Sequence, residues 1–98
     1  MTKHVVQVGD LSDNSRRFLR IGTREIALFC VAGKVFALDD SCPHAGASLS
    51  GGLIEGGKVR CRAHGLAFDL ATGCMGGAGL SVKTYPVSVS GETVTIEI

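Results

Sequence analysis

Short hydrophobic runs separated by glycine-containing turns make up most of the chain, and none of them shows a sustained helical spacing. The runs are rich in valine, isoleucine, threonine and phenylalanine, which is typical of β-strands. In the N-terminal part we expect strands joined by tight turns, in a meander of antiparallel hairpins. These strands cover residues 5–8, 17–21, 25–31 and 35–38.

The third of these runs contains one of the four cysteines. Because side chains alternate between the two faces of a strand, Ile26, Leu28 and Cys30 share one face. A free cysteine in such a place behaves as a small buried hydrophobe. We therefore assign Cys30 to the core and give it no chemistry.

The C-terminal part of the chain repeats the strand pattern. Residues 81–89 are expected to pair with residues 93–98 across a turn at residues 90–92. Val94 and Ile96 would lie on one face of the last strand, together with the terminal isoleucine. This hairpin would close a sheet.

Between these parts the composition changes to glycine, serine, alanine, cysteine and histidine, with short strand candidates only at residues 58–61 and 66–70. A long loop-rich insertion in a compact β domain is usually functional. We predict a single all-β domain of 98 residues. Its basal β scaffold takes up about residues 1–40 and 81–98, and the inserted subdomain takes up about residues 41–80.

Composition limits the core and the class of partner. Hydrophobic residues make up 45% of the chain but aromatic residues only 5%, so the core is thin, and small domains of this kind usually need a staple. The net charge of +1 argues against a nucleic-acid partner.

No apolar span reaches the roughly 18–20 residues that a membrane-crossing helix needs, and the N-terminal residues do not resemble a signal peptide. We expect a cytoplasmic monomer, in which four cysteines are more typical of metal or redox chemistry than of disulfides.

Two pairs of cysteine and histidine lie in the inserted segment, Cys42 with His44 and Cys61 with His64. Each pair lies in a loop, so a hairpin between the loops can bring four soft or borderline ligands to one metal centre. Such a set could hold a single tetrahedral zinc. Zinc fingers, however, usually pair cysteine with cysteine and place the histidines on a helix. Loops that mix both types suit a two-iron centre, in which one iron is bound by thiolates and the other by imidazoles.

The residues around these pairs resemble the two boxes of Rieske-type ferredoxins, Cys-x-His-x-Gly and Cys-x-x-His-Gly. The first box is Cys42-Pro-His-Ala-Gly46, and the second is Cys61-Arg-Ala-His-Gly65. The second box continues as Leu-Ala-Phe-Asp-Leu-Ala-Thr-Gly, which is similar to the hairpin that follows it in the family. The resemblance implies a Rieske-type antiparallel β-sandwich of stacked sheets. It also implies one [2Fe–2S] cluster, bound by two cysteines and two histidines. These ligands are Cys42, His44, Cys61 and His64.

Departures from the respiratory members of this family indicate the reduction potential. Those members carry an extra cysteine in each box and a serine beside the second, where this chain has Ala47, Ala63 and Leu66. The resemblance therefore implies the low end of a range of roughly −150 to +300 mV. Low-potential members of the family are soluble ferredoxins and oxygenase domains.

The resemblance further implies an electron carrier rather than an enzyme. Single electrons would pass from an NAD(P)H-dependent flavin reductase to a terminal oxygenase that hydroxylates aromatic rings, with docking near His44 and His64. His4 is the one histidine outside the boxes, and no Gly-x-Gly-x-x-Gly opens a helix, so no mononuclear iron or nicotinamide site is expected. Two alternatives are the small subunit of an assimilatory nitrite reductase and a zinc-stapled structural β domain.

Three further features remain open at this point. Lys58, Arg60 and Arg62 alternate along the strand that leads to the second box, and they form either a solvated edge or a docking contact for an acidic patch on a partner. Cys74 begins a glycine-rich segment, where we expect a structural role rather than a reactive one. His4 is expected to be a surface residue of the first strand.

Overall fold

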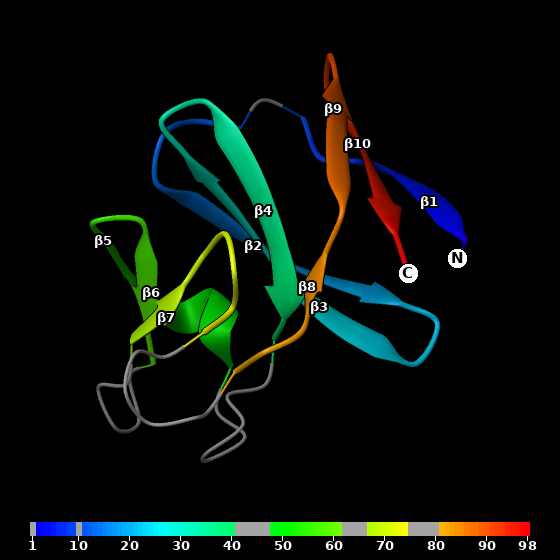
Figure 1. Cartoon of the computed structure of the whole chain (residues 1–98). Coiled ribbons are helices and arrows are strands. Elements are labelled where there is room, and N and C mark those ends of the chain that lie inside the picture. Colours follow the sequence, from blue (N-terminus) through cyan, green and yellow to red (C-terminus); the bar gives the residue numbers. More distant parts are fainter. Residues whose placement is uncertain (1, 10, 41–47, 62–66, 75–80) are drawn as a thin grey trace.

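The computed structural model describes residues 2–9, 11–40, 48–61, 67–74 and 81–98. These residues form antiparallel sheets and one short 3₁₀ helix, which confirms the predicted all-β class (Figure 1). No helix among them is long and apolar enough to cross a membrane. In chain order the elements are β1 (Lys3–Gln7), β2 (Ser15–Ile21), β3 (Arg24–Val31), β4 (Lys34–Asp39), η1 (Leu49–Gly51), β5 (Leu53–Glu55), β6 (Lys58–Arg60), β7 (Ala67–Asp69), β8 (Thr84–Tyr85), β9 (Val87–Ser90) and β10 (Thr93–Glu97).

The largest sheet has the strand order β2-β3-β4-β8, and β3 is buried on both of its faces. Ile26 and Leu28 belong to one hydrophobic cluster, whereas Ala27 and Phe29 belong to another. Since neighbouring residues of a strand face opposite sides, β3 separates two cores. Cys30 is 5% exposed, which confirms its predicted place in the interior.

A second sheet with the order β1-β10-β9 supplies Val94 and Ile96 to the cluster that contains Ile26 and Leu28. Both Val94 and Ile96 are fully buried, as the sequence predicts for this face of the last strand. The sheets thus stack around a shared core, with β9 and β10 on one side of the molecule in Figure 1.

The position of β1 differs from the sequence prediction. The pattern predicts a meander from the first strand onward, but β1 pairs with β10, so that His4 lies opposite Ile96 and Val6 opposite Val94. Val6 packs against the same cluster as these two partners, which gives β1 a hydrophobic contact on its inner face. His4 is accordingly half-buried, which corrects its predicted place on the surface.

The C-terminal hairpin also differs from its prediction. Instead of one strand over residues 81–89, the chain forms β8, which pairs with β4, and then β9, which pairs with β10. Pro86 lies between them and has no N–H to donate to a ladder, so the strand is interrupted there. Its carbonyl still accepts the N–H of Glu97 at 3.0 Å. This short interruption lets one run of residues pass from the first sheet to the second.

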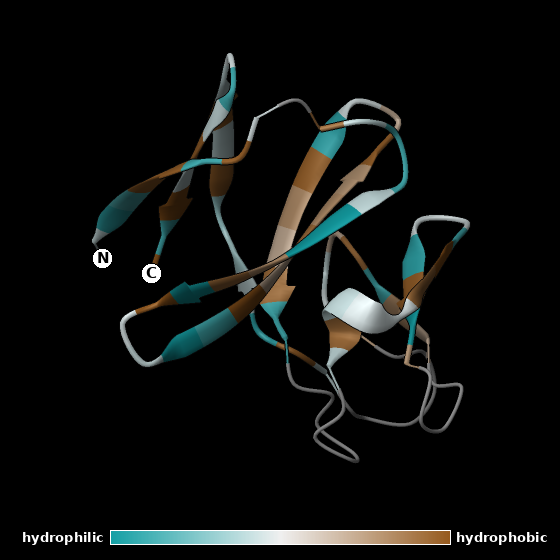
Figure 2. Ribbon diagram, turned by 180° about the vertical axis from the view of Figure 1, so that it is seen from behind, coloured by the Kyte–Doolittle hydropathy of each residue, from teal (hydrophilic) through white to brown (hydrophobic). Residues whose placement is uncertain are grey.

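The third sheet, β5-β6-β7, comes entirely from the inserted segment. β6 and β7 correspond to the two predicted strand candidates, whereas β5 was not predicted. Val59 and Phe68 are fully buried and belong to the cluster of Phe29, so this sheet covers the face of β3 opposite to β10. Figure 2 shows the hydrophobic stretches along strands at the centre of the molecule and hydrophilic residues near the ends of the hairpins.

Gly73 provides a test of this packing. Its φ is +75°, and an added Cβ would lie 2.2 Å from the carbonyl oxygen of Val82. We expect Gly73→Ala to lower the free energy of unfolding by more than about 2 kcal/mol, because a left-handed backbone is strained for alanine and the clash adds to that strain. Gly91 has φ +60° and open space around it, so Gly91→Ala should cost only about 1 kcal/mol. Urea denaturation followed by circular dichroism would compare the two, and equal losses would contradict the packing described here.

Candidate metal centre

One of the four predicted ligands lies within the described residues. Cys61 directly follows β6, is 0% exposed and carries a free thiol. It belongs to the hydrophobic cluster that contains Val59 and Phe68. Cys42, His44 and His64 lie outside the described residues, as does Arg62. A thiol shielded from water at the start of the second box fits a soft metal ligand in an iron–sulfur centre.

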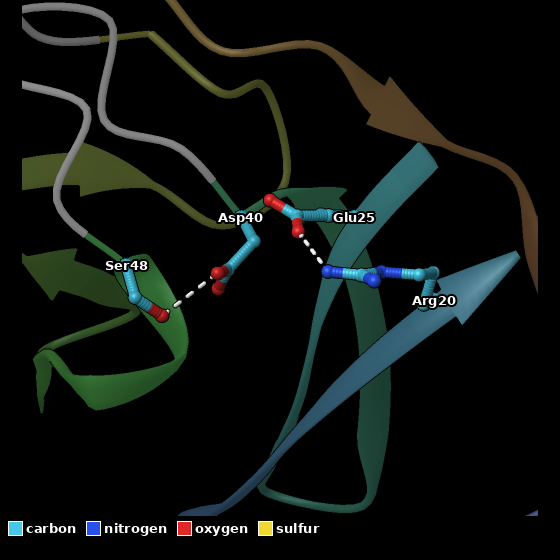
Figure 3. A network of polar contacts seen from close by, with 4 residues as sticks. All are labelled: Arg20, Glu25, Asp40 and Ser48. Atoms are coloured by element: carbon cyan, nitrogen blue, oxygen red, sulfur yellow. Dashed lines mark hydrogen bonds and ion pairs between the residues drawn. The ribbon is translucent and has the colours of Figure 1, made fainter. Parts of the chain in front are cut away.

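The segment that carries Cys42 and His44 leaves the described chain after Asp40 and rejoins it at Ser48. The carboxylate of Asp40 accepts the hydroxyl of Ser48 at 2.7 Å and the N–H of Ser50 at 2.8 Å. Its backbone carbonyl accepts the N–H of Leu49 at 2.5 Å. Figure 3 shows the side chains of Asp40 and Ser48 facing each other. Both ends of the first segment are therefore held side by side.

The segment that carries His64 is closed by strand pairing. β6 and β7 are antiparallel, and Arg60 lies opposite Ala67 in their register. Cys61 therefore stands at the base of a hairpin loop, directly beyond the last paired residue of β6. Its neighbours in the core fix this base against the buried face of the small sheet.

The bases of the two segments meet in one hydrophobic cluster. Leu49, at the end of the first segment, and Cys61, at the start of the second, are both fully buried members of it. Gly52 makes this approach close, because a Cβ there would lie 2.5 Å from the carbonyl oxygen of Arg60. The Nη1 of Arg16 donates to the carbonyl of Gly52 and ties the small sheet to β2. The sequence predicts that a hairpin brings the two boxes together. In the structure, Leu49 after the first box and Cys61 at the start of the second lie in the same hydrophobic cluster.

The glycine-rich segment that follows Cys74 is also closed at its base. Cys74 and Ser81 form an isolated antiparallel bridge, and the N–H of Val82 donates to the carbonyl of Gly73 at 2.8 Å. The backbone carbonyl of Cys74 accepts the N–H of Asp69 at 2.9 Å, whereas its side chain is exposed and unpaired with another cysteine. The backbone of Cys74 thus closes this base, while its Sγ donates to the nearby carbonyl of Thr72 at 3.8 Å.

The basic residues before the second box lie beside acidic ones. Lys58 and Arg60 are exposed and share a face of β6, as their alternation predicts. Arg60 lies 3.6 Å from the carboxylate of Glu55, and Lys58 is paired in register with both Glu55 and Asp69. Among these described residues, the two positive charges are therefore matched by two negative ones.

Asp39 and Tyr85 form a contact that sequence reasoning missed. The hydroxyl of Tyr85 on β8 donates to the carboxylate of Asp39 at the end of β4. Burial, then the hydrogen bond and the charge of Asp39, raise the pKa of Tyr85 from its ordinary 10.0 to about 12. Asp39 and Asp40 lie just before the first box, which begins at Cys42, and no pattern used in the sequence analysis singles them out.

Comparison with known proteins agrees with the boxes in the sequence. The family model of the Rieske [2Fe-2S] domain matches residues 2–86. The ferredoxin component of a naphthalene 1,2-dioxygenase system from Pseudomonas aeruginosa is 38% identical over 77 residues, which cover 76% of this chain and 74% of that protein. The ferredoxin of Sphingomonas yanoikuyae B1 superposes with a TM-score of 0.83 at 28% identity, over 97% of this chain and 99% of that one. A chain from a complex of reduced oxygenase and oxidised ferredoxin in carbazole 1,9a-dioxygenase superposes with a TM-score of 0.82 at 28% identity, over 94% of this chain and 91% of that one.

The raised pKa of Tyr85 predicts how stability depends on pH. A phenol whose pKa is higher in the folded state stabilises the fold fully below about pH 10, and this contribution is lost as the pH rises towards about 12. Tyr85 is the single tyrosine of the chain, so absorbance at a tyrosinate wavelength reports on it directly, with Tyr85→Phe as the blank. We expect a midpoint near 12 that moves down in Asp39→Asn, because that variant removes the negative charge. A midpoint near 10 in the unmodified chain would contradict the contact.

Proposed function

Since the chain belongs to the Rieske [2Fe–2S] domain family, we propose that it is the ferredoxin component of an aromatic ring-hydroxylating dioxygenase system. In this role it carries single electrons and has no substrate of its own. The observation that supports this proposal most is the match to relatives that are themselves named as ferredoxins or ferredoxin components. The match extends over nearly the whole of this chain and of the Sphingomonas ferredoxin.

The proposed ligands are Cys42, His44, Cys61 and His64, with one cysteine and one histidine from each box. A bound [2Fe–2S] cluster of this kind takes up and releases one electron, at a higher potential than a cluster held by four thiolates. We place the potential at the low end of the Rieske range, because Ala47, Ala63 and Leu66 supply neither an additional bridge nor a hydroxyl donor.

The described residues support this role through burial and anchoring. Cys61 is fully buried among apolar side chains, which keeps water from the thiolate side of the proposed centre. The contacts of Asp40 hold the ends of the first ligand segment, and the pairing of β6 with β7 holds those of the second. The chain thus fixes where each ligand pair begins and ends.

The proposed partners are a terminal oxygenase, which takes the electron, and an NAD(P)H-dependent flavin reductase, which supplies it. A solved complex that joins an oxygenase and a ferredoxin of carbazole dioxygenase supports the first partner. We propose that both partners dock near His44 and His64, where an imidazole that binds iron through one nitrogen presents the other. Lys58 and Arg60 add less to this docking than their charge alone suggests, because Glu55 and Asp69 lie beside them. The proposed setting is the cytoplasm, with the protein as a monomer.

The ligand assignment predicts different outcomes for two histidines. His64→Ala should abolish the visible absorption of the Rieske cluster, because one iron loses a ligand. His4→Ala is the matched control, since His4 is half-buried on β1 and far from both boxes in the sequence, and it should keep the spectrum. Retention of the spectrum in His64→Ala would refute the assignment. A colourless protein that contains zinc would favour the structural zinc module instead.

The carrier function predicts rapid electron transfer to an oxygenase. Protein reduced by dithionite under anaerobic conditions should be reoxidised in stopped-flow mixing with the oxidised oxygenase of a naphthalene 1,2-dioxygenase system. The rate should fall as salt is raised if charged residues guide the encounter. A cluster that stays reduced with this oxygenase, and with that of a carbazole dioxygenase, would argue for a subunit role such as that in an assimilatory nitrite reductase.

A further inference from the structure

Asp40 is the only charged residue that is buried among those the structure describes, with 4% of its surface exposed. A carboxylate is costly to remove from water unless hydrogen bonds compensate for the lost hydration. An exposed turn between two strands would not need such a residue. The burial of Asp40 is therefore explained by the hydrogen bonds that its oxygens accept.

Within the part of the chain that the structure describes, the carboxylate bonds to groups on the far side of the first ligand segment. One oxygen accepts the hydroxyl of Ser48 and the other accepts the N–H of Ser50. Ser48 is the N-cap residue of η1, but its own side chain does not cap the helix. Asp40 binds the N–H of Ser50 in its place, from ten positions earlier in the chain. The start of η1 is thus fixed to the end of β4.

The backbone of Asp40 is anchored on the opposite side as well. Its N–H donates to the carbonyl of Glu25, at the start of β3, at 3.0 Å. The carboxylate of Glu25 in turn binds Arg20 at 2.6 Å, and Figure 3 shows Glu25 between Arg20 and Asp40. Asp40 is therefore tied through its backbone to β3, the most deeply buried strand among the described residues.

We propose that Asp40 is a positioning residue for the first pair of cluster ligands. Cys42 and His44 both lie between Asp40 and Ser48, the two residues whose side chains are joined. By fixing the distance between these ends, Asp40 limits the arrangements that the ligand pair can adopt. This inference rests on the proposed function, since it assigns Asp40 a role towards the same cluster.

Three variants distinguish a role in positioning the cluster ligands from a contribution to the stability of the fold alone. Asp40→Ala removes both acceptors, Ser48→Ala removes one donor, and Asp40→Asn keeps one acceptor for Ser50 and gains a donor for the hydroxyl of Ser48. The readouts are the rate of cluster loss to a chelator and the g values of the reduced cluster in electron paramagnetic resonance. We expect Asp40→Ala to lose the cluster about tenfold faster, as removal of outer-shell partners does at other metal sites. Its g values should shift, those of Ser48→Ala should shift less, and Asp40→Asn should stay nearest to the unmodified chain.

Asp13 offers a matched control. Its carboxylate accepts the N–H groups of Asn14 and Ala32 at 3.1 and 2.7 Å, so it also joins two distant parts of the chain, but no box lies between them. Asp13→Ala should lower the urea midpoint and leave the g values and the loss rate unchanged. The proposal is overturned if Asp40→Ala behaves in the same way. If Asp40→Ala does not fold, unchanged g values and loss rate in Ser48→Ala overturn it. Absence of a cluster from the unmodified chain would instead refute the proposed function, and the inference with it.

Discussion

Burial of β3 on both faces is the constraint on which the rest of the structure depends. A strand whose side chains are apolar on both sides must be covered twice, and the chain meets this need with two different layers. The C-terminal hairpin and β1 cover one face, and the small sheet of the inserted segment covers the other. The inserted segment is therefore part of the core, and the candidate ligand Cys61 lies inside the cluster that Phe29 anchors.

This arrangement explains how a loop-rich segment can support a metal centre. The boxes themselves contain few apolar residues, so they gain little from hydrophobic burial and need fixed ends. The fixed ends come from the pairing of β6 with β7 and from the bonds of Asp40. Metal binding and folding are coupled in metal sites of small domains, because ligand segments with few apolar contacts have little else to order them.

Much of the fold follows from the sequence, because periodicity predicts strands, and the candidate chemistry follows from the spacing, which predicts the ligand pairs. The partner of β1 does not follow, since alternation tells which face is buried but not which strand lies alongside. Pro86 is a visible signal for the break between β8 and β9, and its missing N–H explains the change of sheet. Asp40 is hardest to foresee, because an acidic residue is expected on the surface and only the tertiary structure brings Ser48 and Ser50 to it.

The most direct test of this account is the Mössbauer spectrum of protein enriched in ⁵⁷Fe, before and after reduction with dithionite. If one iron is bound by Cys42 and Cys61 and the other by His44 and His64, the oxidised protein should show two distinct iron sites of equal area. Reduction should then change mainly one of them, because the electron localises on the iron bound by neutral imidazoles. Two equivalent irons in the oxidised protein, or protein that binds no iron when iron and sulfide are supplied, would contradict the account.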